Sequence, residues 1–456
     1  MILLPRRGFP ARRALTPRIA ALLYPPRAAP SRRPSLALLS LIVLALVVSG
    51  MTLSTNGQDP SQASTAPSLS LFGAVLPKAA EEVPQALGVS LRADRLGFWS
   101  KGSAQKRAAN LLATMGPEEV LGQVFLLGFP GDRPPTLLYD WIERRGIGGV
   151  KIFGWNTEDS GRLAEAVAAL QAVALANGPG IPLLIATDQE GGIVRHVKGA
   201  TSETPGNMAI GASGRPSDAY WSGYYIAREL DAVGVNMNFA PAVDLASSPR
   251  SSLIGVRSFS SDPLEAGLLG AALSAGTMAA GLIPTAKHFP GHGGTDLDSH
   301  GVLPRIDIGA DTLWNRELVP FRMLVGEGLP AVMSGHLSFP RIDPSGAPAS
   351  LSKYFLTDLL RGRLGFKGVV VTDDLRMGGA PGSFASNCKK ALEAGDDLLM
   401  SSILPDLDDE AWTTLLASYE NDANFRSRVR EAAARVLALK LEWLAPRGMS
   451  ALVPKA

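Results

Sequence analysis

Residues 368–373 read Gly-Val-Val-Val-Thr-Asp, a run of β-branched apolar residues that ends at the carboxylate of Asp373. A short run of this kind is typical of a strand that is buried on both faces, as strands are in a parallel sheet. Comparable apolar runs end in Asp188, His288 and His336. Because the carboxyl ends of parallel strands open on one face of a barrel, we expect these four ionisable side chains to share one pocket.

Eight strand-like segments of this type can be counted from residue 105 onward. They span residues 123–129, 149–153, 183–188, 235–240, 284–288, 331–336, 368–373 and 397–401. Segments with helical spacing alternate with them, at residues 137–145, 160–176, 218–232, 263–280, 312–326, 352–364, 384–394 and 410–419, and a last helix is expected at residues 425–443. Alternating strands and helices indicate βα units, and a closed barrel needs eight strands. We therefore predict an α/β fold in which one (β/α)8 TIM-type barrel is the single catalytic domain.

The predicted barrel spans residues 105–445, and a tail follows at residues 446–456. The first 50 residues hold eight arginines and neither lysine nor acidic residues, and an apolar run extends from Leu36 to Leu53. Residues 1–53 therefore have the pattern of an export signal or a signal-anchor. Residues 54–104 are predicted to form a flexible linker, rich at its start in Ser, Thr, Pro, Gln and Asn, and a pre-barrel arm.

The apolar run lacks the marks of a signal that is removed. No Ala-x-Ala-like site follows it, and no cysteine that could carry a lipid lies near it. We therefore expect an anchor in the inner membrane, with the domain after residue 53 outside the cytoplasm, in the cell envelope. A cleaved signal would make the protein secreted, and a true start at Met51 would make the enzyme cytoplasmic.

Charge and cysteine content exclude two further classes. Removing the eight N-terminal arginines from the net charge of +2 leaves 2 − 8 = −6 for the rest of the chain. A mildly acidic body with dispersed basic residues has no electrostatic footprint for nucleic acid, so we expect no nucleic-acid partner. Cys388 is the single cysteine, which excludes an intramolecular disulfide, and we interpret it as structural.

A glycine-rich loop at residues 286–300 carries three of the five histidines. A zinc site is one interpretation. However, the loop has neither a helical pair of histidines four residues apart nor an H-E-x-x-H pattern, so we expect no metal. The other interpretation takes Asp298 and His300 as a dyad, in which the carboxylate orients the imidazole for general acid–base catalysis near neutral pH. A mobile loop would bring His300 to the substrate, whereas a solvated loop histidine is the alternative.

Asp373 stands at the mouth of the seventh predicted strand. A carboxylate there can attack the anomeric carbon of a sugar and form a glycosyl-enzyme intermediate. Alternation along the strand sends Asp373 and Asp374 to opposite sides, so we expect only one of them to face the pocket. A structural ion pair at the barrel rim is the alternative role for this carboxylate.

Four motifs resemble glycoside hydrolase family 3, and more narrowly its bacterial single-domain β-N-acetylhexosaminidases. They are Thr-Asp-Gln-Glu-Gly-Gly at 187–192, Ile-Gly-Val-Arg-Ser-Phe at 254–259, Lys-His-Phe-Pro-Gly-His-Gly at 287–293 with Asp-Ser-His at 298–300, and Thr-Asp-Asp-Leu at 372–375. The resemblance covers roughly residues 105–400. Three positions depart from the family pattern: His196 stands in place of an arginine, Val256 in place of an acidic residue and Gly294 in place of an aspartate.

The resemblance implies specific roles. The residue that matches the family's nucleophile is Asp373, and the family's acid/base histidine and its partner carboxylate match His300 and Asp298. This pairing is typical of the hexosaminidase branch, since the β-glucosidase branch generally takes its acid/base carboxylate from a second domain. The resemblance further implies that the terminal sugar is held by Asp188, Arg257, Lys287 and His288.

The resulting functional hypothesis is a retaining exo-glycosidase that removes terminal non-reducing β-linked N-acetylglucosamine, without a cofactor. The predicted partners are an N-acetylglucosamine-containing glycan or muropeptide and, through the N-terminal segment, the membrane. The predicted location suggests peptidoglycan fragments as substrate. Three alternatives remain open: a β-glycoside phosphorylase, because a histidine acid/base tolerates phosphate as acceptor; a β-glucosidase of the same family; and a sugar-binding protein without activity.

Overall fold

The computed structural model describes residues 103–199, 201–246, 253–402 and 409–445. All described residues belong to one compact unit of the chain. The predicted targeting segment at 1–53, the linker and arm up to residue 102, and the tail at 446–456 lie outside the described residues. Within the described part, no helix is long and apolar enough to cross a membrane.

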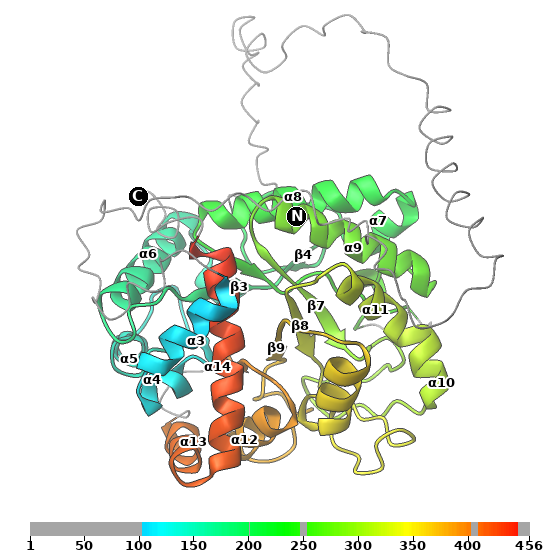
Figure 1. Ribbon diagram of the computed structural model, residues 1–456. Coiled ribbons are helices and arrows are strands. Elements are labelled where there is room, and N and C mark those ends of the chain that lie inside the picture. Colours follow the sequence, from blue (N-terminus) through cyan, green and yellow to red (C-terminus); the bar gives the residue numbers. More distant parts are fainter. Residues whose placement is uncertain (1–102, 200, 247–252, 403–408, 446–456) are drawn as a thin grey trace, which may run out of the picture. The chain divides into compact units, whose positions relative to one another are not determined.

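Eight parallel strands form one sheet in the order β10-β1-β2-β3-β6-β7-β8-β9, and helices surround them (Figure 1). The strands are β1 Phe125–Leu127, β2 Gly149–Ile152, β3 Leu184–Thr187, β6 Met237–Asn238, β7 Ile283–Phe289, β8 Ala331–Ser334, β9 Val369–Thr372 and β10 Leu399–Ser401. The two ends of the sheet meet through a parallel bridge between Val371 of β9 and Leu398. The sheet is therefore a barrel, and the predicted fold class and all eight predicted strands are confirmed.

Helices follow the strands at the predicted places. They are α5 Thr136–Asp140 with η2 Trp141–Arg145, α6 Ser160–Ala176, α8 Pro216–Ala232, α9 Pro263–Ala279, α10 Ala310–Thr312 with η5 Leu313–Glu317 and α11 Leu318–Gly326, η7 Tyr354–Arg363, α12 Phe384–Ala394, α13 Asp409–Asn421 and α14 Ala423–Trp443. The sequence pattern did not predict α3 Ala104–Thr114, α4 Pro117–Gly122, α7 Asn207–Ser213 or the antiparallel pair β4 Gln189–Gly191 and β5 Val194–Arg195. Short 3-10 turns lie at η3 Gly154–Asn156, η4 Gly255–Arg257 and η6 Ala349–Leu351.

Side-chain caps explain where four of the long helices begin. Asp159, Asp262, Ser383 and Asp422 stand at the starts of α6, α9, α12 and α14, and each side chain accepts a hydrogen bond from a backbone N–H of the first turn. Such a cap satisfies donors that the helix itself leaves free and stabilises it by about 1 kcal/mol. Helices α6, α9 and α12 follow strands β2, β6 and β9, so their caps fix the ends that are nearest the loops after these strands.

The alternation of side chains along each strand separates two cores. In β9, Val369 and Val371 pack in the cluster inside the barrel, whereas Val370 packs in the cluster beneath the surrounding helices. In β2, Val150 and Ile152 join the outer core, so the alternation turns Lys151 into the barrel. The barrel interior is therefore apolar towards the amino ends of the strands and charged towards their carboxyl ends.

Candidate active site

A cavity of about 430 Å³ opens at the carboxyl ends of the strands. It is lined by Phe153, Trp155, Asp188, Val194, His196, Leu253, Arg257, Lys287, His288, His292, Ser299, His300, Met333, Asp373, Asp374, Met377, Met400 and Ser402. Seven side chains have a predicted catalytic or sugar-binding role, and six of them line this cavity; the seventh, Asp298, contacts His300. The structure thus brings residues from all four sequence motifs into one pocket.

Asp188 occupies the end of β3 between two buried lysines. Its Oδ1 lies 2.5 Å from Lys287 Nζ, and its Oδ2 lies 2.8 Å from Lys151 Nζ. Burial alone would raise the pKa of Asp188, but the two ammonium groups hold it well below its ordinary value. Burial lowers the pKa of Lys151, whereas Lys287, although buried, has a raised pKa because it faces two carboxylates. The trio is therefore a fixed, charged cluster, of which Asp188 and Lys287 line the cavity.

Glu190 is the second carboxylate that Lys287 contacts, at 2.6 Å. Arg257 binds the same carboxylate in a bidentate manner, with Nε 2.9 Å from Oε2 and Nη2 2.7 Å from Oε1. Burial opposes ionisation, yet Lys287 and Arg257 lower the pKa of Glu190 to about 2. Bidentate pairing fixes the direction of the guanidinium, so Arg257 is held in place at the wall of the cavity.

His288 and His292 are held by the fully buried carboxylate of Asp244. Its Oδ2 lies 2.7 Å from His288 Nδ1, and its Oδ1 accepts a 2.7 Å hydrogen bond from the backbone N–H of His292. Because a carboxylate with a depressed pKa only accepts hydrogen bonds, Nδ1 of His288 carries the proton in this pair. Burial lowers the pKa of His292 to about 4, so this imidazole is neutral near pH 7.

The predicted dyad of Asp298 and His300 is present. Asp298 Oδ1 lies 2.7 Å from His300 Nδ1 and also accepts the backbone N–H of His300 at 2.9 Å. Both side chains are more than half exposed, at 53% and 70%. The loop is fixed at its base, where Gly378 N and Gly379 N donate to the carbonyl oxygens of His300 and Ser299.

The expectation that only one of Asp373 and Asp374 faces the pocket is wrong, because both line it. Strand β9 ends at Thr372, so the alternation of a pleated strand no longer applies to the two residues that follow. Their ionisation differs. Burial would raise the pKa of Asp373, but His288 and His336 lower it, whereas burial raises the pKa of Asp374.

The expectation that His336 shares the pocket wall is also wrong. Its side chain is fully buried, with Nδ1 2.7 Å from Ser350 Oγ and Nε2 2.9 Å from the carbonyl oxygen of Asp374. The imidazole therefore packs behind the cavity and supports the backbone that carries the two carboxylates. His336 contributes to the lowered pKa of Asp373 without lining the pocket, and burial lowers the pKa of His336 itself.

Several residues of the site were missed by the reasoning from sequence. The sequence motifs assign no role to Lys151 or Asp244, and they include His196 only as a departure from the family pattern and Glu190 only as a motif residue. The signal for Lys151 was available, since a lysine within an apolar strand is buried only when it is paired. His196 lies 3.4 Å from Lys151 Nζ and 3.8 Å from Asp188 Oδ2, measured from its Nδ1, and burial lowers its pKa to about 4.

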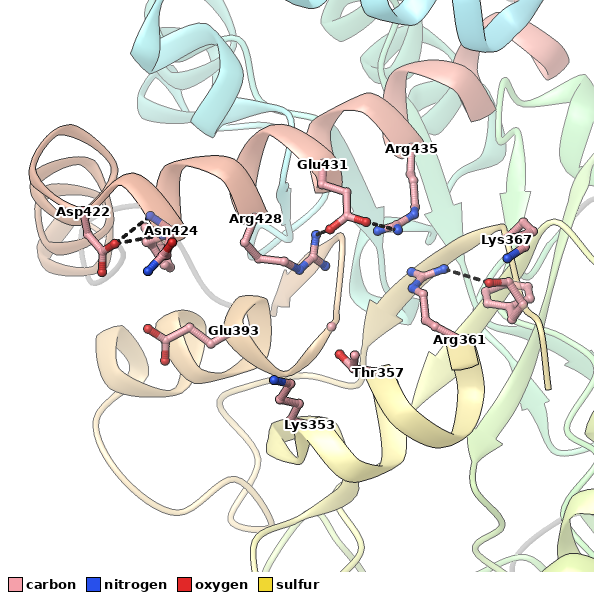
Figure 2. A pocket seen from close by; sticks show the side chains of 13 residues that line it. Lys353, Thr357, Arg361, Lys367, Glu393, Asp422, Asn424, Arg428, Glu431 and Arg435 are labelled. Carbon is pink, nitrogen blue, oxygen red and sulfur yellow. Dashed lines mark hydrogen bonds and ion pairs between the residues drawn. The ribbon is translucent and has the colours of Figure 1, made fainter. Parts of the chain in front are cut away.

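A second cavity, of about 490 Å³, lies between η7, α12 and α14 (Figure 2). Arg361, Arg428 and Arg435 lie on its wall, and all three pair with the buried carboxylate of Asp397. Glu431 pairs with the two arginines of α14, as the dashed lines show. These pairs join the helices to the start of β10, so we interpret this cavity as part of a structural joint.

Comparisons with known proteins agree on one family. A family model described as glycosyl hydrolase family 3 N terminal domain matches residues 118–439. Beta-hexosaminidase A from Pseudoalteromonas piscicida is 40% identical over 261 residues, which cover 54% of this chain and 44% of that protein. Beta-hexosaminidase from Pseudomonas aeruginosa (strain LESB58) is 39% identical over 255 residues, covering 55% and 74%.

A solved structure shares the fold. A glycoside hydrolase family 3 beta-N-acetylglucosaminidase from Paenibacillus sp. str. FPU-7 superposes with a TM-score of 0.69 and 37% identity, covering 73% of this chain and 63% of that chain. The present chain thus spans less than half the length of the Pseudoalteromonas relative and less than two thirds of the Paenibacillus structure. Among the described residues, no group of three His, Cys, Asp or Glu side chains is placed to hold a metal ion.

Proposed function

The chain belongs to glycosyl hydrolase family 3, and we propose that it is a retaining exo-β-N-acetylglucosaminidase whose covalent intermediate forms on Asp373. One observation carries the proposal: a single cavity is lined both by Asp373 and His300 and by the buried cluster of Asp188, Arg257 and Lys287. A carboxylate and a protonatable group beside a polar sugar site are the parts that a double displacement needs.

Asp373 is the better nucleophile of the two adjacent carboxylates. Its depressed pKa keeps it ionised at neutral pH, and its Oδ1 accepts the backbone N–H of Asp374 at 2.9 Å, which orients it. Asp374 has a raised pKa, and its Oδ1 is engaged by the backbone N–H groups of Arg376 and Ser402. Asp374 therefore shapes the turn, and Asp373 supplies the attacking oxygen.

His300 supplies the proton in the proposed mechanism. Its Nδ1 faces Asp298, which leaves Nε2 for the substrate. In the first step a carboxylate oxygen of Asp373 bonds to the anomeric carbon, the glycosidic C–O bond breaks, and the leaving oxygen takes the proton from Nε2. In the second step Nε2 takes a proton from water, whose oxygen bonds to the anomeric carbon and displaces Asp373.

The buried charged cluster holds the terminal sugar. Hydroxyl and acetamido groups are donors and acceptors without charge, so charged partners make strong hydrogen bonds with them. Asp188 can accept from sugar hydroxyls, while Lys287, Arg257 and the Nε2 of His288 can interact with hydroxyl or carbonyl oxygens. Because Asp188 and Glu190 both bind Lys287, the cluster is already ordered before substrate arrives.

The sugar preference is proposed from the relatives, two of which are named beta-hexosaminidase and one beta-N-acetylglucosaminidase. Peptidoglycan fragments are the proposed natural substrate, because the arginine-rich and apolar residues 1–53 favour a place in the cell envelope, anchored to the membrane. Fractionation of cells and protease treatment of spheroplasts would test this location. A soluble, protected protein would contradict the anchor, and failure to release N-acetylglucosamine from muropeptides would contradict the substrate.

The activity is tested by comparing 4-nitrophenyl β-N-acetylglucosaminide with 4-nitrophenyl β-glucoside as substrates of the full-length protein. Rapid release from the first only, lost by a factor of at least about 10³ in Asp373→Asn, supports the branch and the nucleophile. Asp358→Asn, on the outer helix η7, is the matched carboxylate control. A fluorinated slow substrate should also add its glycosyl mass to Asp373, and an unmodified Asp373 with an adduct elsewhere would refute the assignment.

Phosphorolysis is the second candidate, favoured by one observation. A histidine acid/base is neutral after it donates its proton, so it does not repel an incoming phosphate as a carboxylate would. Turnover with and without phosphate, with detection of N-acetylglucosamine 1-phosphate, distinguishes the two reactions. Release of free sugar at the same rate in both buffers supports hydrolysis, and faster turnover to the sugar phosphate would replace it with phosphorolysis.

A further inference from the structure

The rim of the active-site cavity carries an aromatic side chain that the proposed mechanism does not use. Trp155 lies in the short turn η3 after β2, lines the cavity and is 49% exposed. We propose that Trp155 is the platform on which the first ring of the leaving group stacks when that group is a sugar. The inference rests on the proposed exo-glycosidase function, because it assumes that the terminal sugar is enclosed and the next one lies at the rim.

A series of contacts leads from the charged floor to this rim. Lys151 Nζ, paired with Asp188, lies 4.1 Å from the centre of the Phe153 ring. Trp155 stacks on Phe153 with ring centres 4.5 Å apart and an interplanar angle of 10°. A cation and a parallel ring at these distances must cover opposite faces of Phe153. Trp155 is therefore the outermost layer, one ring beyond the groups that are proposed to hold the terminal sugar.

Trp155 is held rigidly although it is half exposed. Its indole N–H donates to the carbonyl oxygen of Phe129 at 2.8 Å. The adjacent Asn156 is braced as well, because its Nδ2 donates to Phe129 and Gly131 and its Oδ1 accepts the backbone N–H of Phe153. Phe153 covers one face of the indole, so the exposed surface is its other face and outer edge. A ring fixed in this way binds a partner with little loss of side-chain freedom.

A pyranose ring is the ligand that fits such a surface. Its C–H groups form an apolar face, and an aromatic ring presents a flat face of matching size. Val194, Leu253 and Met377, which also line the cavity, are apolar too and offer no ionised group to a leaving sugar. Trp155 thus sets the preference for a leaving group with a ring over a small alcohol.

The test compares two substrates of the same enzyme. The β-1,4-linked disaccharide of N-acetylglucosamine has a sugar as leaving group, whereas methyl β-N-acetylglucosaminide has only methanol. In Trp155→Ala, kcat/KM for the disaccharide should fall about tenfold more than for the methyl glycoside, and Trp155→Phe should recover most of that difference. Trp221→Ala, which removes a half-exposed tryptophan from the outer helix α8, should leave the ratio of kcat/KM for the disaccharide to kcat/KM for the methyl glycoside unchanged.

The ratio separates stacking from a structural role, because any loss of folded enzyme affects both substrates equally. An equal loss for both substrates in Trp155→Ala, or an equal change of the ratio in Trp221→Ala, would overturn the platform. If the unaltered enzyme releases N-acetylglucosamine from neither substrate, the proposed function itself fails, and this role for Trp155 fails with it. The two failures are therefore distinguishable by the activity of the unaltered enzyme.

Discussion

Lys440 on α14 provides a prediction whose magnitude follows from its surroundings. Its side chain is fully buried, and Nζ donates to Gln123 Oε1 at 2.8 Å. Among the described residues no carboxylate pairs with it, and burial lowers its pKa from 10.5 to about 7. At 1.36 kcal/mol per pH unit, this shift corresponds to a penalty of roughly 5 kcal/mol for burying the charged form.

The sign of the pH dependence follows from proton binding. Between pH 7 and 10.5 the unfolded lysine binds a proton that the folded one has lost, so stability should rise with pH by up to about 1.4 kcal/mol per unit. Below pH 7 both states are charged, and the full penalty applies. Replacing Lys440 by Met removes this titration, but it leaves Gln123 without its partner at a cost of about 1–3 kcal/mol.

Lys440→Met should therefore stabilise the protein by roughly 2–4 kcal/mol at pH 6, and the gain should disappear near pH 10. Urea unfolding of the unaltered protein and the variant at each pH from 6 to 10 measures the difference. Lys106→Met, at an exposed position of α3, is the control and should change stability by less than about 0.5 kcal/mol at every pH. Parallel curves for the unaltered protein and Lys440→Met would show that the buried lysine is not the titrating group.

Three further predictions concern the ion pairs of Asp397, the loop that carries His300 and the ion pairs of Glu190. Asp397→Asn should lower the free energy of unfolding by about 3–5 kcal/mol, because three arginines lose their shared carboxylate; an unchanged urea midpoint would contradict this. Gly378→Ala should reduce kcat more than it raises KM, because the new Cβ would lie 2.3 Å from the carbonyl oxygen of Gly301 and would displace the loop that carries His300. Unaltered kcat and KM in steady-state kinetics would contradict this prediction. Glu190→Gln should lower kcat/KM about 10²-fold, because Lys287 and Arg257 lose the carboxylate that they share. Glu203→Gln, at an exposed position, is the control, and a similar loss of kcat/KM in both variants would refute the role of Glu190.

The barrel and its strands could be predicted because each strand can be recognised from its own residues. Three successive valines before Thr372 and Asp373 indicate a buried strand without knowledge of its neighbours. Helices α6 and α12 were predicted with the bounds that the structure gives, because their apolar spacing and capping residues are local as well. Helix α3 was not predicted. It packs against α14, which lies at the other end of the barrel's sequence, and a local sequence pattern contains no information on such a contact.

The proposed catalytic pair, Asp373 and His300, could be predicted from sequence motifs, whereas the groups that surround it could not. Asp244 is separated from His288 by 44 residues, and Lys151 is separated from Asp188 by 37, so their pairing depends on which strands become neighbours. His336 was placed in the pocket from its position at a strand end, whereas its ring turns to Ser350 behind the wall. The direction of a side chain after a strand ends is set by the turn and by its tertiary partners.

The fold class, the eight strands and the carboxyl-end positions of Asp188, His288 and Asp373 could be predicted from the sequence, because these features follow from short-range hydrophobic pattern. Tertiary contacts place both Asp373 and Asp374 at the cavity, Asp188 between two lysines, and Trp155, half exposed, on the cavity wall. The physical reason is that charge, burial and pKa depend on distances between residues far apart in the chain. Those distances exist only once the barrel has closed.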